Sequence, residues 1–324
     1  MGNKKGFVYS ATLDGKGSSQ EITKDHQALW KNSESLVWFH LDYQDDAAVH
    51  WLKQDSSLSE LTVDILTSED TRPRSIPADG GLLICLRGVN CNPGQDPDDM
   101  VSLRLWIGQG QIVTMRHRRV AAIDDIRLAL TQGNGPTDIG DFLVLLCERM
   151  TDRMADVVGD IDDSVDALED QILEKERAAL RSQLSGVRRM IIGLRRHLVP
   201  QRELLSRLQN ERADWLSDFD KLHLREIGER TTRCIEDLDA ARDRAAIAQE
   251  ELNARLSEQM NQTIYMMSIV ATIFLPLGLL TGLLGINVGG IPGAETSWAF
   301  LFVCVLLVVL AILVYFIFKK KQVL

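Results

Sequence analysis

The sequence predicts an α/β N-terminal domain, followed by long α-helices and a two-helix transmembrane hairpin at the C-terminus. Two uncharged stretches, 259–294 and 298–318, lie close to the end of the chain. Each is long enough to cross a bilayer core of about 30 Å, which takes about 20 apolar residues in a helix. Since backbone polar groups cannot stay unpaired in lipid, both stretches are expected to be helical. The preceding residues are mostly polar, and their patterns change from strand-like to helix-like near residue 136.

Residues 1–136 are expected to form a mixed sheet with covering helices. Apolar segments predict strands at 6–13, 35–41 and 81–89, and a hairpin of 102–107 with 111–116 around Gly108-Gln109-Gly110. Residues 45–53 and 59–66 are typical of short helices. Pro93, Gly94 and Pro97 indicate a loop at 90–99, and Gly133-Asn134-Gly135-Pro136 ends the domain.

Residues 137–260 are predicted to form long helices. The segment 141–173 has apolar residues at helical spacing and many outward acids, whereas 177–210 is rich in arginine. Either the two helices pair their opposite charges, or the acids form a surface that attracts cations. Pro200 is expected to interrupt the second helix.

A third helix is predicted from Lys221 to Leu284, about 95 Å long at 1.5 Å per residue. It would carry the stalk (up to residue 260) into the first span, TM1, at 261–285. A loop at 286–297, a second span at 298–318 and a tail at 319–324 would follow. The stalk carries a narrow apolar seam for close packing, formed by Leu238, Ala241, Ala245, Ala248, Leu252 and Leu256.

Charge and cysteine content exclude several classes of protein. The net charge of −10 argues against a nucleic-acid partner. The five cysteines form no CxxC pair, which fits a reducing cytosol. Residues 1–20 are polar, so no signal peptide is expected and the spans would insert by themselves. The loop at 286–297 has no Lys or Arg, whereas Lys319, Lys320 and Lys321 follow the second span, so both termini are predicted to be cytoplasmic.

Two spans cannot enclose a channel, so a pore would need a ring of identical subunits. Counting back from Asn287 in helical steps gives one face of the first span, which we call the pore face. It carries no acid to replace the hydration shell of a cation, so a cation that passes along it is expected to stay largely hydrated. Leu275 and Met267 are candidates for apolar constrictions that gate by dewetting. The pore face comprises Asn261, Ile264, Ser268, Ala271, Leu275, Gly278 and Gly282, with Met267 at its edge.

Several of these residues have a second interpretation. Asn287 fits either a ring of amides that binds the water shell of a cation or a helix C-cap. Asn261 is either a second polar ring or an interfacial hydrogen-bonding group. Gly278 and Gly282 permit close helix contact or a hinge. Glu295 in the outer loop either attracts cations or is simply solvated.

The segment 265–277, followed by Gly285-Ile286-Asn287 and Ile291-Pro292, resembles the CorA family of divalent-metal transporters. In that family a Gly-Met-Asn tripeptide ends the first span, and Ile286 in place of Met resembles the zinc-transporting branch, the ZntB proteins. The resemblance implies a homopentamer in the bacterial inner membrane. It also implies an entrance filter of Gly285, Ile286 and Asn287, and zinc uptake that is linked to protons.

The identity of the transported ion and the transport mechanism each have alternatives. Magnesium, cobalt, nickel or cadmium could replace zinc as the transported ion, and no resident cofactor is expected. The spans contain no Asp, Glu or His for a proton relay, which favours passive conduction. A membrane-anchored scaffold without flux is a further alternative. An enzyme is not expected, because the sequence has no phosphate loop, nucleophile elbow or metalloprotease motif.

Overall fold

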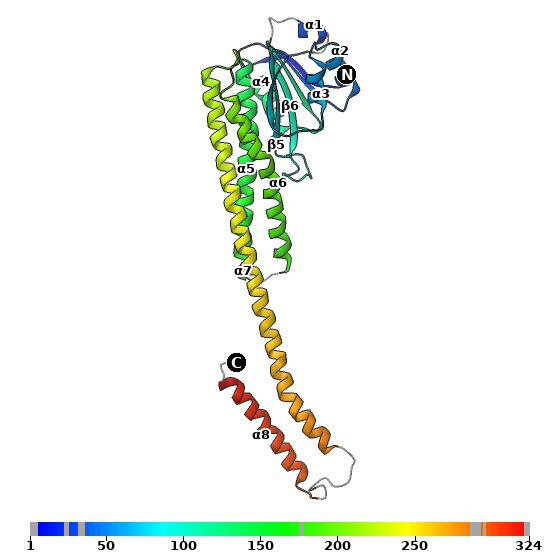
Figure 1. Ribbon diagram of the computed structural model, residues 1–324, viewed down its shortest axis with the longest axis vertical. Coiled ribbons are helices and arrows are strands. Elements are labelled where there is room, and N and C mark those ends of the chain that lie inside the picture. Colours follow the sequence, from blue (N-terminus) through cyan, green and yellow to red (C-terminus); the bar gives the residue numbers. More distant parts are fainter. Residues whose placement is uncertain are drawn as a thin grey trace. The chain divides into compact units, whose positions relative to one another are not determined.

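The computed structural model describes residues 6–22, 26–31, 36–174, 178–285, 293 and 296–320 (Figure 1). The chain divides into two compact units, Met1–Gln249 and Glu250–Leu324. The first unit holds a seven-stranded sheet and helices α1 to α6. Helix α7 (Asp218–Leu284) begins in the first unit and ends in the second, which also holds α8 (Ala299–Lys320).

The sheet is mixed, as predicted, with the strand order β2-β1-β3-β7-β6-β5-β4. Only the pair β3–β7 is parallel among the described strands. At the β6–β7 turn, Gln109 and Gly110 both have positive φ (51° and 81°), the conformation of a tight two-residue hairpin. The strands are β1 (Phe7–Leu13), β2 (Ser19–Glu21), β3 (Leu36–Asp42), β4 (Arg74–Ala78), β5 (Gly81–Gly88), β6 (Val101–Gly108) and β7 (Gln111–Arg116).

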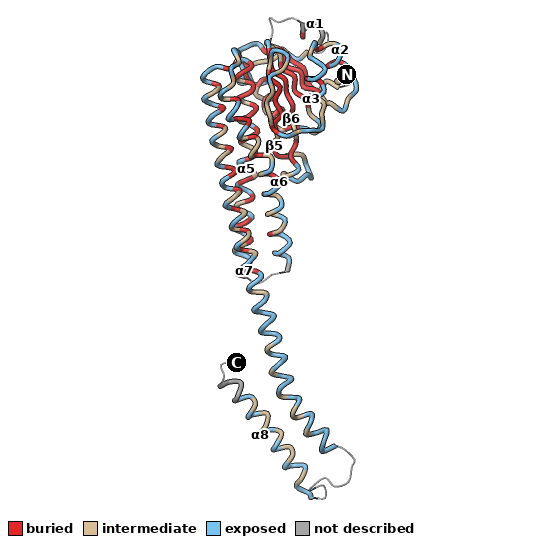
Figure 2. Tube along the Cα trace, viewed as in Figure 1, coloured by how far each residue is buried: buried red, intermediate tan, exposed pale blue. Residues whose placement is uncertain are grey.

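Helices cover both faces of the sheet and bury its alternating apolar residues (Figure 2). One face packs on α1 (His26–Lys31), α2 (Asp46–Gln54) and α3 (Glu60–Thr67) through Trp30, Trp51 and Leu66. The other face packs on α4 (Ala121–Thr131), α5 (Ile139–Glu174), α6 (Ala178–Leu208) and the start of α7. Caps fix the predicted short helices, since Asp45 and Ser59 accept backbone N–H groups at the starts of α2 and α3.

Four elements were absent from the sequence prediction: β2, β4, α1 and α4. Strand β4 contains Pro77, which argues against a central strand, and it lies at the edge of the sheet where the missing N–H is tolerated. Helix α4 has no side-chain cap at its start, so the usual sequence signal for a helix start is lacking. Both elements gain their stability from packing on the rest of the first unit.

The prediction that Pro200 interrupts the second long helix was wrong, because α6 continues through it. The next residue, Gln201, is buried, and its Oε1 accepts the backbone N–H of Arg87 on β5 at 2.8 Å. Proline cannot form the backbone hydrogen bond at this position. Packing of α6 on β4 and β5 therefore keeps the helix continuous there.

Among the described residues, the ion pairs do not join the two long helices whose opposite charges suggested mutual pairing, α5 and α6. In the described part of the chain, acids of α5 pair with arginines of α7 rather than with those of α6. Arg244 of α7 contacts three carboxylates of α5: Asp162 at 2.9 Å, Glu169 at 2.7 Å, and Asp166. Arg195 of α6 likewise pairs with Asp239 of α7 at 2.9 Å. Helix α7 therefore lies where it receives charge pairs from both helices.

The narrow apolar seam predicted on the stalk is buried on α7 as far as Leu252, as expected. Leu238, Ala245 and Leu252 are completely buried, and Ala241 and Ala248 are nearly so. Leu256 is only half-buried, so the tightly packed part ends one turn earlier than predicted.

Enlarging the seam is expected to destabilise the protein. Ala245→Leu adds three carbon atoms at a fully buried position, and overpacking of this kind costs about 1–3 kcal/mol. The midpoint of thermal unfolding, Tm, in detergent should fall by several degrees. The control is Ala240→Leu, at an exposed position of the same helix, which should leave Tm nearly unchanged. Equal shifts in both variants would contradict close packing at the seam.

A buried histidine lies in the centre of the sheet. Nδ1 of His40 on β3 is 2.8 Å from Oγ1 of Thr114, which also accepts the indole N–H of Trp38 at 2.8 Å. Burial, with the nearby positive charges of Arg116 and Arg127, lowers the pKa of His40 from 6.5 to about 3. His40 is therefore neutral in the folded protein at neutral pH.

Acidification is expected to destabilise the protein through His40. Below pH 6.5 the unfolded chain takes up a proton on this side chain, whereas the folded chain does so only near pH 3. As the pH falls from 6.5 to 3, the free energy of unfolding should thus decrease by about 1.4 kcal/mol per pH unit. Above pH 6.5 His40 is neutral in both states, so its protonation contributes nothing to the pH dependence there. The drop in Tm from pH 7.5 to 5.5 should be smaller in His40→Gln than in the unmodified protein. Identical drops would show that His40 does not titrate in this way.

Candidate ion pathway

The pore face predicted from the sequence lies on the last part of α7. All of its residues, from Asn261 to Gly282, are within the helix and are exposed in the single chain, and so is Met267 at its edge. Leu275 is 73% exposed and Met267 is 70% exposed, which is unusual for large apolar side chains in a folded protein. These side chains therefore require lipid or further protein to cover them.

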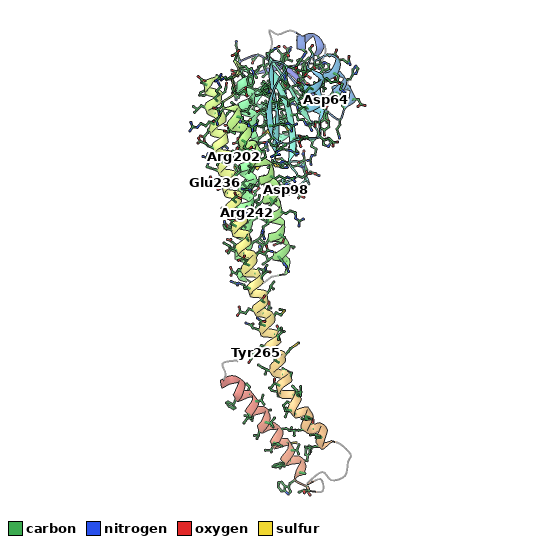
Figure 3. The ribbon with its side chains drawn as sticks, in the orientation of Figure 1. Asp64, Asp98, Arg202, Glu236, Arg242 and Tyr265 are labelled. Atoms are coloured by element: carbon green, nitrogen blue, oxygen red, sulfur yellow. The ribbon has the colours of Figure 1, made fainter. Side chains whose placement is uncertain are left out.

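The other side of the same helix is partly covered. A half-buried stripe begins at Tyr265 (Figure 3) and continues through Ile269, Ile273, Leu277 and Leu280. Ile273 and Leu277 each lie two positions from Leu275, which places them about 160° away around the helix. The stripe is thus opposite the pore face, so the second unit leaves the pore face open.

Hydroxyl groups in this segment are bonded to the helix itself. Ser268 donates to the carbonyl oxygen of Ile264 at 2.9 Å, and Thr272 donates to that of Ser268 at 2.7 Å. Their protons are therefore occupied, and only oxygen lone pairs remain to face a solute. The pore face offers a passing cation the lone pairs of Ser268, the amide of Asn261 and apolar surface, but no charge.

The two glycines of the pore face have open space beside them. A Cβ atom placed on Gly278 or Gly282 would meet nothing within 4 Å, so the close helix contact expected at these positions is not made within the chain. Pro276 lies inside α7 and does not end it. The space at the glycines is available to another copy of the chain or to lipid.

The filter residues are only partly within the described residues. Gly285 follows α7, and its backbone N–H donates to the carbonyl oxygen of Thr281 at 2.9 Å. Ile286, Asn287 and Glu295 lie outside the described residues. The positions that the sequence assigns to the entrance filter and to external cation attraction therefore stay predictions.

Some acidic side chains of α7, which could otherwise attract cations, are paired with arginines of the same helix. In the first unit, Asp243 pairs with Arg242 at 2.9 Å, and in the second unit Glu251 pairs with Arg255 at 2.5 Å. An uninterrupted acidic wall is thus not supported. Among the described residues, no cluster of three or more His, Cys, Asp and Glu side chains has the arrangement of a metal site.

The Arg244 cluster was missed by sequence reasoning, although a signal for it exists. Its three partners, Asp162, Asp166 and Glu169, recur at four- and three-residue steps and therefore share one face of α5. The hydrogen bonds to Glu169 and Asp166 raise the pKa of Arg244, so the cation is permanently charged. The cluster fixes the part of α7 in the first unit against α5.

Among the described residues, two helices are long and apolar enough to cross a membrane: α7, through its C-terminal part, and α8 over Ala299–Phe316. Their best windows have mean hydropathies of 2.1 and 3.2 and are not buried in the protein. This agrees with the hairpin that the sequence predicts.

Comparison with known proteins adds the family. A family model described as CorA-like Mg2+ transporter protein matches residues 33–320. The zinc transport protein ZntB of Yersinia enterocolitica is 39% identical over 305 residues, which are 94% of this chain and 92% of that protein. The divalent cation transporter CmaX of Pseudomonas aeruginosa is 36% identical over 324 residues, 99% of this chain and 98% of that one. The solved structure of full-length CmaX has a TM-score of 0.86 and 36% identity, and 99% of each chain is covered.

The motif around Gly285 and the two apolar helices thus occur in a chain whose whole length matches transporters of divalent metals. The resemblance deduced from the sequence is confirmed, together with the α/β domain, the long helices and the two apolar C-terminal helices. The chain belongs to the family of CorA-like Mg2+ transporter proteins.

Proposed function

We propose that this protein transports divalent cations across a membrane, and that zinc is its main substrate. The observation that carries the proposal is the pore face of α7, which is uncharged, exposed in the single chain and opposite the half-buried stripe. A ring of identical chains would bring these faces together around an axis and would cover them. The family relationship supports transport as the function, in place of catalysis.

Zinc is supported by two features. The tripeptide at 285–287 has Ile286 where the family pattern has methionine, and a relative of 39% identity is named a zinc transport protein. The other relative is named only as a divalent cation transporter, and the family description names Mg2+. Magnesium, cobalt, nickel and cadmium are therefore the competing ions in any test.

In this proposal the ion keeps much of its water. Removing the shell of a divalent ion needs oxygen ligands of high charge, and the pore face offers amide, hydroxyl and apolar groups only. Asn287, with Gly285 and Ile286, would bind the hydrated ion at the outer end, with Glu295 nearby. Leu275 and Met267 would close the pathway by excluding water. The membrane potential supplies about 4–5 kcal/mol for a divalent ion at 100 mV, so uptake does not require protons.

The remaining assignments belong to the same proposal. Residues 1–136 and 137–260 would lie in the cytoplasm, 261–285 and 298–318 would cross the inner membrane in contact with lipid, and 286–297 would face outside. Both termini would be cytoplasmic because the basic residues follow the second span. The ring would be a pentamer, as the family resemblance implies.

The mass of the complex in mild detergent tests the ring. We expect a single oligomer of several chains, and a monomer would contradict a pore built from the α7 faces. A dye inside proteoliposomes that reports zinc tests the transport itself. An anchored scaffold would form the same membrane hairpin but would give no influx with any divalent ion.

A further inference from the structure

We propose a second binding site, for a phosphate group, between the edge strand β4 and helix α6. A cavity of about 210 Å³ lies there, inside the first unit. Three arginines line it, Arg72, Arg74 and Arg207, together with one acidic residue, Glu203. This concentration of positive charge stands out in a chain whose net charge is −10. The proposal is separate from transport.

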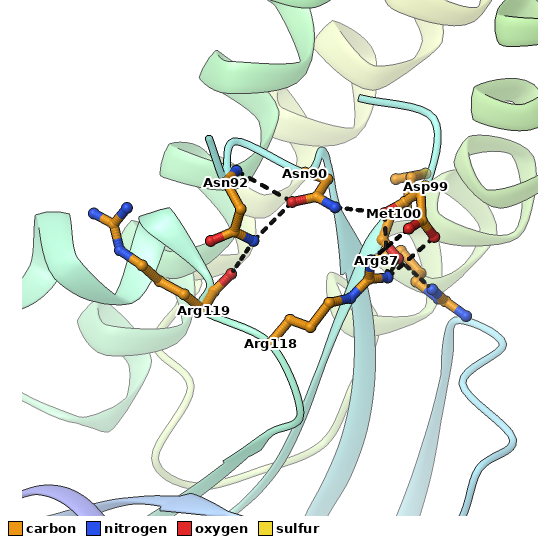
Figure 4. A network of polar contacts seen from close by, with 7 residues as sticks. All are labelled: Arg87, Asn90, Asn92, Asp99, Met100, Arg118 and Arg119. Atoms are coloured by element: carbon orange, nitrogen blue, oxygen red, sulfur yellow. Dashed lines mark hydrogen bonds and ion pairs between the residues drawn. The ribbon is translucent and has the colours of Figure 1, made fainter. Parts of the chain in front are cut away.

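Partly buried hydrogen bonds of Arg87 fix both walls of the cavity. Arg87 on β5 donates from Nε to the carbonyl oxygen of Thr71 at 3.1 Å, which fixes the chain just before Arg72. It also donates from Nη1 to the carbonyl oxygen of Met100 at 2.7 Å (Figure 4). The backbone N–H of the same residue donates to buried Gln201 on α6. One residue thus ties the segment at Thr71 and the helix at Gln201 to the sheet, and the cavity between them is preformed.

The guanidinium groups that line the cavity retain unused hydrogen-bonding capacity. Nη1 of Arg74 forms an ion pair with Asp70 at 2.8 Å, but the Asp70 side chain is 68% exposed, so the pair is weak. In the described part of the chain, Arg72 and Arg207 form no ion pair, and Glu203 does not reach within salt-bridge distance of Arg207. Arg72 and Arg207 are exposed, and no acceptor in the described part of the chain takes up their guanidinium donors, which leaves them free to bind a ligand.

Phosphate fits this arrangement best. The planar fork of arginine binds two oxygens of a phosphate at once, and several arginines can bind different oxygens of the same group. Pro73 and Pro200 complete the walls, and their rings hold the backbone at these positions in place. The ligand is a phosphate or a phosphate monoester, whether free in solution or carried by a lipid headgroup.

Calorimetric titration of the full-length protein, in detergent and in a phosphate-free buffer of low ionic strength, tests the site. Inorganic phosphate and pyrophosphate represent the free source, and a short-chain phosphatidic acid represents the headgroup. Arg207→Gln should raise the Kd about tenfold, the loss expected for one charge-assisted contact. Glu203→Gln should lower the Kd about threefold, because it removes a negative charge that repels the phosphate.

The matched control is Arg181→Gln, which removes the same charge from an exposed position of α6 that does not line the cavity. It should leave the Kd within about twofold, through long-range electrostatics alone. Opposite shifts at Arg207 and Glu203 with any of the three probes support the site, and the probe that binds identifies the source. The proposal is overturned if none of the probes binds, or if Arg207→Gln and Arg181→Gln weaken binding equally.

Discussion

Zinc influx into proteoliposomes is expected to fall at least about tenfold when Asn287 is replaced with alanine, which is a loss of about 1.4 kcal/mol. In the proposed ring, each subunit contributes one amide to the outer end of the pathway. A methyl group cannot bind the water shell of a zinc ion, so every subunit loses its contact at once. Each lost hydrogen bond contributes about 0.5–1.5 kcal/mol, which makes the combined effect large.

The control for this substitution is Gln262→Ala. Gln262 also carries an amide, in the first span, and is exposed, but it lies about 140° around α7 from Leu275, away from the pore face. Influx in this variant should stay near that of the unmodified protein. Full activity of Asn287→Ala, with the oligomer intact, would refute the filter.

Replacing Leu275 with serine is expected to raise the influx of divalent ions about tenfold, if dewetting at this position contributes about 1.4 kcal/mol to the barrier. Leu275 is the most exposed large side chain of the pore face. A ring of leucines excludes water from a narrow pathway, whereas a ring of serines allows water and hydrated ions to stay. The initial rate of zinc influx at fixed membrane potential measures this effect.

The control variant Leu277→Ser distinguishes an effect on the pore from a general loss of helix stability. Leu277 belongs to the half-buried stripe opposite Leu275, so the same change there should lower stability without raising influx. If both variants leak equally, the pathway does not follow the pore face. If Leu275→Ser conducts no faster than the unmodified protein, Leu275 does not form the constriction.

Sequence periodicity predicted the long elements well for a physical reason. Helix α7 was expected over 221–284 and extends over Asp218–Leu284, because a helix of this length shows its period many times. Strand β4 and helix α4 are short and depend on contacts with residues far away in the sequence. Pro77 in β4 even argues locally against a strand, and only its position at the sheet edge makes it acceptable.

The charge pairs show where sequence reasoning fails. Acidic α5 and basic α6 suggest mutual pairing, but α7 receives Asp152 and Asp162 from one and Arg195 from the other. The buried apolar residues decide which helices pack together. The charged side chains then pair with whichever neighbours this packing provides. The pore face, in contrast, follows from helical geometry alone, and its residues are found together on the open side of α7.

Zinc and magnesium influx, compared in the same proteoliposomes at matched membrane potential, tests the central claim most directly. The pH gradient is imposed in one series and collapsed in the other, with protein-free liposomes as the blank. We predict zinc influx that exceeds magnesium influx, depends on the membrane potential and persists without the proton gradient. Loss of zinc influx on collapsing the gradient would contradict passive conduction, magnesium influx without zinc influx would contradict the zinc assignment, and no influx of any divalent ion would contradict transport itself.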